Sequence, residues 1–347
     1  MPSPFALPGR PRSAGRLARG PALTAAFAAR LTARDRWLLR MIHEHRVLTT
    51  GQITQLAFGT TRAANARMTT LYRYRAVDRF RPLAPAGSSP LHYILDEAGA
   101  TLLTAEDGIT LADLGYRGDR AMGIALSPRL SHDVGANGVF TALAAAARAS
   151  GGQAALQIWW SERRCAAAWD HARPDGYGRW RDQPPGGQAD VADFFLEYDT
   201  GTEALGRVIA KLPGYAALAA RTGIPTPVLF WVPTMHREAA LRARLAGPPL
   251  HGTHRAASAA QVPGVPIATA VDGISPGGPA GAAWLPVGGP GPRLRLAQLG
   301  QPGTTAPAAA EPGDLPAAPA GGLPWHPPSP VPPDWRDLPR QLPQGRR

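Results

Sequence analysis

The chain has very little lysine, asparagine or cysteine. Its 347 residues include one cysteine, Cys165, one lysine, Lys211, and two asparagines, Asn65 and Asn137. A single cysteine excludes a disulfide within the chain, so we expect a reducing, cytoplasmic setting. No stretch approaches the roughly eighteen consecutive apolar residues of a membrane helix, so we expect no membrane span.

Two common classes of site also have no sequence signature here. No pair of cysteine and histidine clusters has the spacing of a zinc site. No glycine-rich loop of the form G-x-x-x-x-G-K-[ST] is present, which argues against nucleotide hydrolysis.

The charge of the chain is strongly positive, with 37 basic residues against 25 acidic ones and a formal net charge of +12. Such a charge favours a polyanionic partner, either nucleic acid or an acidic membrane surface. Every basic residue except Lys211 is arginine. Lys211 therefore stands out, because arginine is the default cation of this sequence.

Composition divides the chain into four zones. Residues 1–30 form an arginine-rich, acid-free segment, which we interpret as a disordered basic arm. Residues 31–126 and 127–246 have the patterns of two folded domains. Residues 247–347 hold 22 of the 38 prolines, and this composition predicts a disordered tail. Three tryptophans in that tail are either partner-binding spots or unstructured: Trp284, Trp325 and Trp335.

The pattern of the first domain is three helices followed by a hairpin. Thr32 is the expected N-cap of the first helix, and Thr49 with Gln52 predicts a capping box for the second. The third helix starts at Thr60 or Thr61, and residues 80–95 read as two strands around a turn. This order is that of a winged helix, with the second and third helices forming a helix-turn-helix.

Charge supports a DNA-binding role for this domain, because residues 31–85 contain ten arginines and three acids. In a winged helix the third helix enters the major groove and contacts bases and phosphates of double-stranded DNA. We expect these contacts from Arg62, Arg67 and Arg73, with Arg79 and Arg81 flanking the wing. A solvated arginine face, or a winged helix that docks a partner protein, remains an alternative.

The second domain has the pattern α-β-β-β-α-β, followed by a last helix. A helix between the third and fourth strands implies a crossover in a mixed sheet. The expected elements are a helix at 132–149, strands at 155–160, around 166–173, and at 189–199, a helix at 202–221, a strand at 226–233 and a helix at 235–246. Residues 177–188 read as a polar insert.

Three acids of this domain are candidates for one site. Glu197 and Asp199 share a strand face, and Asp175 follows the preceding strand in the triplet Pro-Asp-Gly. Carboxylates that converge need a cation, and Mg²⁺ prefers such oxygen ligands. Lys211 on the next helix could then stabilise charge at a scissile phosphate. Alternatively, Pro-Asp-Gly is an ordinary turn, and the other acids form a solvated face and a helix cap.

This order of strands and acids resembles the PD-(D/E)xK nuclease fold, which is restriction-endonuclease-like. Pro174 and Asp175 match the first half of that motif, and Glu197 matches its acid. Asp199 stands where the motif has lysine. The resemblance implies catalytic roles for Asp175, Glu197, Asp199 and Lys211, the last as a lysine supplied by the adjacent helix.

Residues 31–246 as a whole resemble the actinobacterial replication-relaxation family. The resemblance rests on RPDG (173–176), FFLEYDTGTE (194–203), KLPGY (211–215), VLFWVPTMHRE (228–238), LSHDVGANGVF (130–140) and the N-terminal LTARDRWLLRMIHEHRVLTTGQI (31–53). It implies action on plasmid or other mobile-element DNA, with plasmid replication or transfer proteins as partners.

These observations predict a protein that grips duplex DNA without efficient cleavage, since the strand lysine is replaced. A Mg²⁺-dependent endonuclease or nickase is one alternative. A winged-helix transcription regulator, whose second domain only dimerises or docks a partner, is the other.

Overall fold

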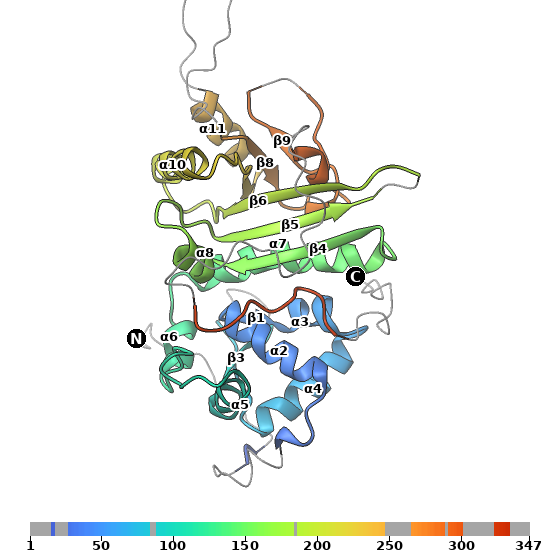
Figure 1. The fold of residues 1–347 in the computed structure, drawn as a ribbon, viewed down its shortest axis with the longest axis vertical. Coiled ribbons are helices and arrows are strands. Elements are labelled where there is room, and N and C mark those ends of the chain that lie inside the picture. Colours follow the sequence, from blue (N-terminus) through green and yellow to red (C-terminus); the bar gives the residue numbers. More distant parts are fainter. Residues whose placement is uncertain are drawn as a thin grey trace, which may run out of the picture. The chain divides into compact units, whose positions relative to one another are not determined.

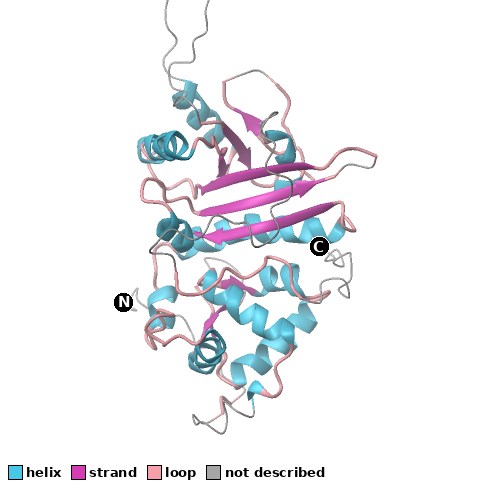
Figure 2. Cartoon of the chain, viewed as in Figure 1, coloured by secondary structure: helices cyan, strands magenta, loops and turns pink. Residues whose placement is uncertain are grey.

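The computed structural model describes residues 15–17, 27–83, 88–183, 186–246, 265–288, 291–300 and 323–333 (Figures 1 and 2). The chain divides into two compact units. Unit 1 comprises residues 1–149 and 324–347, and unit 2 comprises residues 150–323. Both units combine helices with a sheet, so the mixed α+β class expected from the sequence is confirmed.

Three helices begin unit 1: α2 (Ala33–Glu44), α3 (Thr50–Ala57) and α4 (Thr61–Arg73). Each begins after a threonine whose hydroxyl accepts a backbone N–H of the first turn, at Thr32, Thr49 and Thr60. The capping box of Thr49 and Gln52 is confirmed. The α4 face that packs inward is also the predicted one: Ala64, Met68, Leu71 and Tyr72.

A small antiparallel sheet completes this part of unit 1. Its strands are β1 (Leu48–Thr49), β2 (Val77–Phe80) and β3 (His92–Leu95), in the order β1-β3-β2. Strands β2 and β3 lie at the two ends of the predicted hairpin, and they pair from Val77 with Leu95 onwards. Strand β1 was not expected, because two residues carry no periodic pattern.

Three more helices belong to unit 1: α5 (Glu97–Asp107), α6 (Arg120–Ala125) and α7 (Leu130–Ala149). Helix α7 is fixed to the first helices by buried polar contacts. The Asn137 amide donates to the carbonyls of His45 and Val47, and the Gln52 amide donates to the carbonyl of Val134. The boundary between the units therefore follows Ala149, later than the 126/127 boundary expected from the sequence.

Unit 2 is built on one six-stranded sheet with the order β4-β5-β6-β7-β8-β9. Pairing is antiparallel from β4 to β6, parallel from β6 to β8, and antiparallel between β8 and β9. The strands are β4 (Ala154–Ser161), β5 (Gly176–Asp182), β6 (Asp190–Tyr198), β7 (Val228–Val232), β8 (Ile267–Val271) and β9 (Leu285–Pro286).

The helices of unit 2 lie in the connections between these strands. They are α8 (Glu162–Ala168), α9 (Leu205–Ile209), α10 (Leu212–Thr222) and α11 (Met235–Ala246), with short 3₁₀ turns at Gly278–Ala280 and Leu296–Leu299. Side chains of α9, α10 and α11 form one buried core with alternate residues of β6 and β7, among them Phe195, Val228 and Phe230. This core fixes α10 against the sheet face that carries Glu197.

The second strand of the sheet lies later in the chain than the sequence predicts. Residues 162–168 form helix α8, and the polar segment read as an insert forms strand β5. The burial of β5 alternates, with Gly176, Gly178 and Trp180 buried. Because its other residues are tyrosine, arginine and aspartate, the strand has the sequence pattern of a polar loop. Asp175 consequently precedes its strand instead of ending it.

The expectation of a disordered tail fails for residues 265–288 and 291–300, which belong to unit 2. Strand β8 is buried along its whole length and pairs with β7. Trp284 is fully buried and contacts Trp231, with ring centroids 5.6 Å apart. Neither local composition nor proline count reveals this, because a parallel strand obtains its partner from a distant segment.

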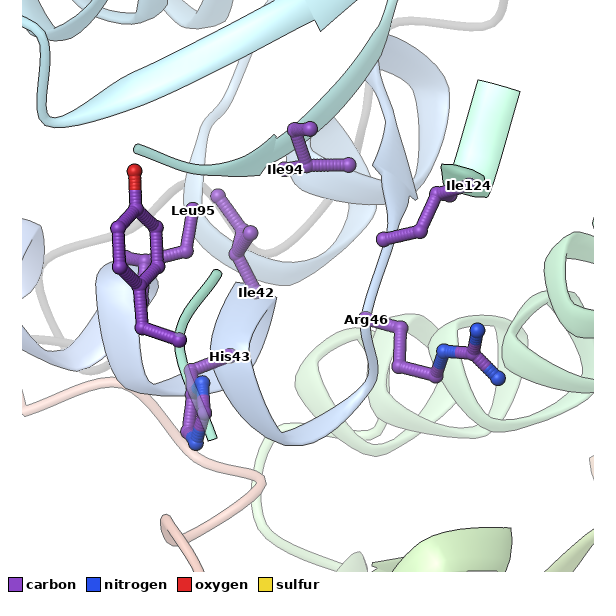
Figure 3. A pocket seen from close by; sticks show the side chains of 7 residues that line it. Ile42, His43, Arg46, Ile94, Leu95 and Ile124 are labelled. Carbon is purple, nitrogen blue, oxygen red and sulfur yellow. The ribbon is translucent and has the colours of Figure 1, made fainter. Parts of the chain in front are cut away.

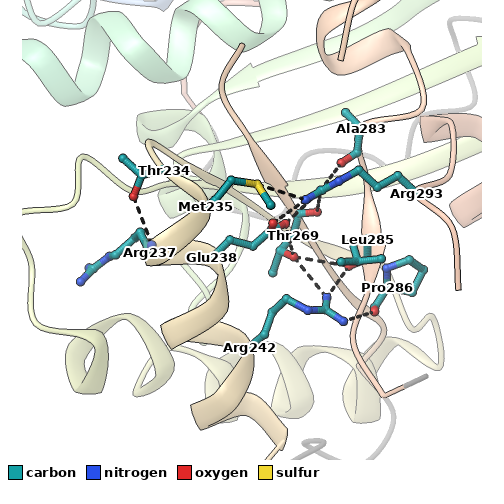
Figure 4. A network of polar contacts seen from close by, with 10 residues as sticks. All are labelled: Thr234, Met235, Arg237, Glu238, Arg242, Thr269, Ala283, Leu285, Pro286 and Arg293. Carbon is teal, nitrogen blue, oxygen red and sulfur yellow. Dashed lines mark hydrogen bonds and ion pairs between the residues drawn. The ribbon is translucent and has the colours of Figure 1, made fainter. Parts of the chain in front are cut away.

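A buried polar network holds this returning segment to α11 (Figure 4). The Arg293 guanidinium lies 2.5 Å from the Glu238 carboxylate and donates to the Ala283 carbonyl at 2.7 Å. The Arg242 guanidinium donates to the Leu285 carbonyl at 2.8 Å, and the Thr269 hydroxyl donates to Glu238 at 2.7 Å. These ion pairs and hydrogen bonds attach the returning segment to α11, although its sequence has no apolar periodicity that would predict the contact.

The predicted basic arm is described only in part. Residues 1–14 and 18–26 lie outside the described residues, as do 247–264, 289–290, 301–322 and 334–347 of the predicted tail. The Arg16 guanidinium pairs with Asp96 and lies 4.9 Å from the ring centre of Tyr72. Residue 16 is therefore docked on unit 1, contrary to the expectation for this segment. In the described segments, no helix combines the length and apolar character that a membrane crossing needs.

Candidate functional site

Asp175 and Glu197 face each other across two antiparallel strands of unit 2. The register pairs Gly176 with Leu196, so Asp175 lies opposite Glu197, one step further along the ladder. The Asp175 backbone N–H donates to the Leu196 carbonyl at 3.0 Å, and its carboxylate accepts the Tyr198 N–H at 2.8 Å. Two of the predicted acids are therefore neighbours, held by backbone contacts.

Helix α10 brings a cation and a phenol to the same carboxylate. Lys211 immediately precedes α10, and its ammonium lies 2.5 Å from Glu197 Oε2. Tyr215, one turn later, donates its hydroxyl to Glu197 Oε1. The spacing of four residues places both side chains on one face of the helix. The structure thus gathers Asp175, Glu197 and Lys211, and adds Tyr215, which the sequence analysis missed.

The burial of this cluster changes how its members ionise. Glu197 is 3% exposed, and its burial, with the neighbouring charge of Asp175, raises its pKa to about 7. Burial alone would lower the pKa of Lys211, but the charges of Glu197 and Asp175 raise it. Burial and the Glu197 charge raise the pKa of Tyr215. The carboxyl group of Glu197 therefore gains or loses its proton close to neutral pH.

Asp199 does not join this cluster. Its carboxylate lies 2.6 Å from the Arg237 guanidinium of α11 and accepts the Gly201 backbone N–H at 2.7 Å. Strand β6 ends at Tyr198, so Asp199 lies one residue beyond the strand, and the alternation of the strand does not fix its direction. Asp199 consequently acts as an anchor for α11 in this structure, and the three acids expected at one point do not converge.

The residues present fit a divalent cation only in part. Within the described ranges, no three histidine, cysteine or acidic side chains are arranged to hold a metal ion. Asp175 and Glu197 supply a pair of neighbouring carboxylates, which are the oxygen ligands that Mg²⁺ uses. However, both oxygens of Glu197 already accept hydrogen bonds from Lys211 and Tyr215. A cation would have to displace the ammonium of Lys211 from this carboxylate.

One of the predicted DNA-binding arginines has a structural partner. Arg67 on α4 donates from Nε to Asp35 Oδ1 at 2.7 Å, and a second nitrogen contacts the other oxygen. Asp35 is 2% exposed and also completes the capping box of α2 with Thr32. Hydrogen bonds to Arg67 and Thr32 lower the pKa of Asp35 against the effect of its burial. Arg67 therefore joins α4 to α2 and is not available as a free cation.

Three of the four remaining candidates of unit 1 are exposed. Arg62, Arg73 and Arg81 are exposed, and no acidic side chain in the described ranges pairs with them. Arg79 is half-buried, with its guanidinium 4.3 Å from the ring centre of Tyr72. Asn65 is also exposed on α4, three residues after Arg62. The scarcity of asparagine in this chain was the signal that could have identified it.

A small pocket in unit 1 offers no room for a cofactor. It is lined by the side chains of Ile42, His43, Arg46, Ile94, Leu95, Tyr116 and Ile124 (Figure 3). Its volume of about 10 Å³ is roughly what one water molecule requires. Its lining is mixed, with four aliphatic side chains beside those of His43, Arg46 and Tyr116.

Comparison with known proteins assigns the chain to a family. A family model described as replication-relaxation matches residues 39–229, more than half of the chain. The protein therefore belongs to the replication-relaxation family, whose description suggests a role in replication and relaxation. No curated protein and no solved structure matches the chain. The matched region spans α4 of unit 1 and the cluster around Glu197 in unit 2.

Proposed function

We propose that the protein grips double-stranded DNA through a winged helix in unit 1, during replication or relaxation of plasmid or integrated-element DNA. Helices α2, α3 and α4 followed by β2 and β3 have the order of that motif, and β1 closes its sheet. Residues 58–60 join α3 to α4 in the short turn typical of a helix-turn-helix. Helix α4 then takes the place of the recognition helix.

The observation that carries this proposal is the contrast between paired and unpaired arginines. Arg36, Arg40 and Arg67 each contact an acid of unit 1. Arg62 and Arg73 on the outward face of α4 have no such partner in the described ranges, and are available for phosphates or bases. The revised DNA-contacting set is therefore Arg62, Asn65, Arg73, Arg79 and Arg81.

Salt dependence of binding provides the test. We expect Arg62→Ala with Arg73→Ala to weaken the binding of a labelled duplex and to reduce the slope of log K against log salt by about 2. The control is Arg117→Ala with Arg129→Ala, which removes two positive charges from exposed residues of unit 1 outside α4. Equal slopes for both double variants, measured by fluorescence anisotropy, would remove α4 from the interface.

We further propose that unit 2 does not cleave DNA efficiently. The carboxylate of Glu197 accepts hydrogen bonds from Lys211 and Tyr215, and the carboxylate of Asp199 forms an ion pair with Arg237. These contacts leave the sheet face without an open set of metal ligands. The nicking assay below tests this statement directly, because activity that depends on Asp175 would contradict it.

A metal-dependent nuclease is the second candidate, favoured by the meeting of Asp175, Glu197 and Lys211. Asp175 and Glu197 would hold a Mg²⁺ ion, which supplies an activated water and charge stabilisation at a phosphate. Incubation of supercoiled plasmid with the full chain and Mg²⁺ or Mn²⁺ distinguishes the candidates. Relaxed or linear product that Asp175→Asn abolishes would establish the nuclease. Intact plasmid with salt-dependent binding supports grip alone.

A further inference from the structure

Residues 324–333, which we call the C-terminal strap, lie against helix α2 of unit 1. Six of these ten residues are proline. Trp325, Pro330 and Pro332 are buried, whereas His326 and Ser329 between them are exposed. The strap thus places a tryptophan and two prolines inward and polar residues outward, which is the pattern of an extended peptide bound along one side.

The backbone of the strap is recognised by an indole of α2. The Trp37 Nε1–H donates to the carbonyl of Ser329 at 2.7 Å, although 292 positions separate the two residues in sequence. A proline-rich segment lacks internal hydrogen bonds, so its carbonyls are available to such donors. Aromatic grooves that bind proline-rich peptides use the same chemistry.

A single large side chain anchors the other end of the strap. Trp325 Nε1–H donates to Glu44 Oε2 at 2.9 Å, and its ring meets the ring of His43 edge-on at 4.7 Å. Glu44 is fully buried and Trp325 is 7% exposed. His43 also lines the small pocket of Figure 3. A buried carboxylate that accepts from an indole selects tryptophan over phenylalanine or leucine.

We propose that Trp37, His43 and Glu44 form a peptide-binding site specific for a tryptophan-anchored, proline-rich segment, and that the strap of the same chain occupies it reversibly. The strap and the site belong to the same chain, and the strap follows Leu323 directly in sequence. Covalent linkage of a binding segment to its site gives that segment an effective concentration on the order of millimolar. Even weak intrinsic affinity then keeps the site filled in cis, while a free peptide must compete with the strap.

The test uses the full chain with Trp325→Ala, which removes the anchor and leaves the site intact. A fluorescein-labelled peptide of residues 321–333 is titrated into this variant and into the wild type. We expect saturable binding to the variant and at least tenfold weaker binding to the wild type. A peptide with alanine for Trp325 should not bind, and one with alanine for the exposed His326 should bind normally.

The site itself is tested by adding Glu44→Gln to the Trp325→Ala chain, which should weaken peptide binding at least fivefold. Absence of saturable binding to a variant with wild-type circular dichroism would overturn the proposal. Equal binding of the peptide with and without its tryptophan would do the same.

A second measurement needs no substitution in the protein. The Trp325 indole N–H resonance of the ¹⁵N-labelled wild type should move towards the solvent-exposed position as excess unlabelled peptide displaces the strap. A resonance that stays unchanged at millimolar peptide would show a fixed part of the fold instead of a binding site.

Discussion

Replacing Glu197 with glutamine should remove a group that titrates near neutral pH. Burial and the facing carboxylate of Asp175 raise the pKa of Glu197 to about 7 from an ordinary value of 4.5, while Lys211 acts in the opposite direction. The amide of glutamine has nearly the same shape: its one oxygen can accept from Lys211, and its NH2 can donate to the Tyr215 hydroxyl, which then acts as the acceptor. The substitution therefore removes the titration with little change in packing.

The magnitude and the sign follow from this pKa difference. A carboxyl whose pKa is raised by folding binds its proton more tightly in the folded chain than in the unfolded chain. Its contribution to stability is fully present below pH 4.5 and is lost as the pH rises through about 7. Each pKa unit corresponds to about 1.4 kcal/mol, so the loss is on the order of 3 kcal/mol. The glutamine variant should not show this loss.

Two measurements check the prediction. A ¹³C titration of the side-chain carboxyls of labelled glutamate should show one resonance with a midpoint near pH 7 that is absent from Glu197→Gln. Urea unfolding of both proteins between pH 5 and 8 should give a difference in free energy that changes with pH.

Substitutions of the two charged neighbours of Glu197 should shift this midpoint in opposite directions. Lys211→Met removes the charge that favours the ionised carboxylate, so it should raise the midpoint further. Asp175→Asn removes a repelling charge and should lower the midpoint. Glutamate resonances that all titrate in the ordinary range, or two variants that shift the midpoint in one direction, would contradict the geometry of the cluster.

Three further substitutions probe the framework around the proposed sites, each measured by urea unfolding. Arg67→Ala leaves Asp35 buried without its cation, so it should destabilise unit 1 by about 1–3 kcal/mol, and unchanged stability would return Arg67 to the DNA-contacting set. Arg293→Ala leaves the carboxylate of the buried Glu238 without its cation and should lower the free energy of unfolding by about 3–5 kcal/mol. Unchanged stability would show that residues 291–300 do not hold β8 in place. Thr49→Ala removes the N-cap of α3 and should cost about 1 kcal/mol, whereas Thr49→Ser should be nearly neutral.

Local patterns in the sequence were sufficient to predict the first helices of unit 1. A capping box at Thr49 depends on residues three positions apart, and the inward face of α4 depends on the helical period. The crossover from β6 through α10 to β7 was predictable for the same reason, since Val228–Val232 is a continuous apolar run. These features need no knowledge of distant residues.

Long-range ion pairs were beyond the same reasoning. Arg67 reaches Asp35 across 32 positions, and Asp199 reaches Arg237 across 38. For an arginine at a helix position that the periodicity predicts to be exposed, the sequence does not show whether an acidic side chain of a neighbouring helix pairs with it. In a chain with 36 arginines and one lysine, nearly every acid has a choice of cations, and only the fold decides among them.

The presence of lysine instead of arginine at position 211 is explained by the hydrogen bonds that the Glu197 carboxylate already accepts. One oxygen of this carboxylate is taken by the Tyr215 hydroxyl, so a cation has access to the other oxygen alone. A guanidinium is a planar fork that favours two parallel hydrogen bonds to both oxygens, whereas an ammonium is a compact charge that needs one contact. Arginine at this position would compete with the Tyr215 hydroxyl for Glu197 Oε1. Lysine therefore fits the cluster that the sheet and α10 create, whether that cluster serves a bound phosphate or only holds α10 in place.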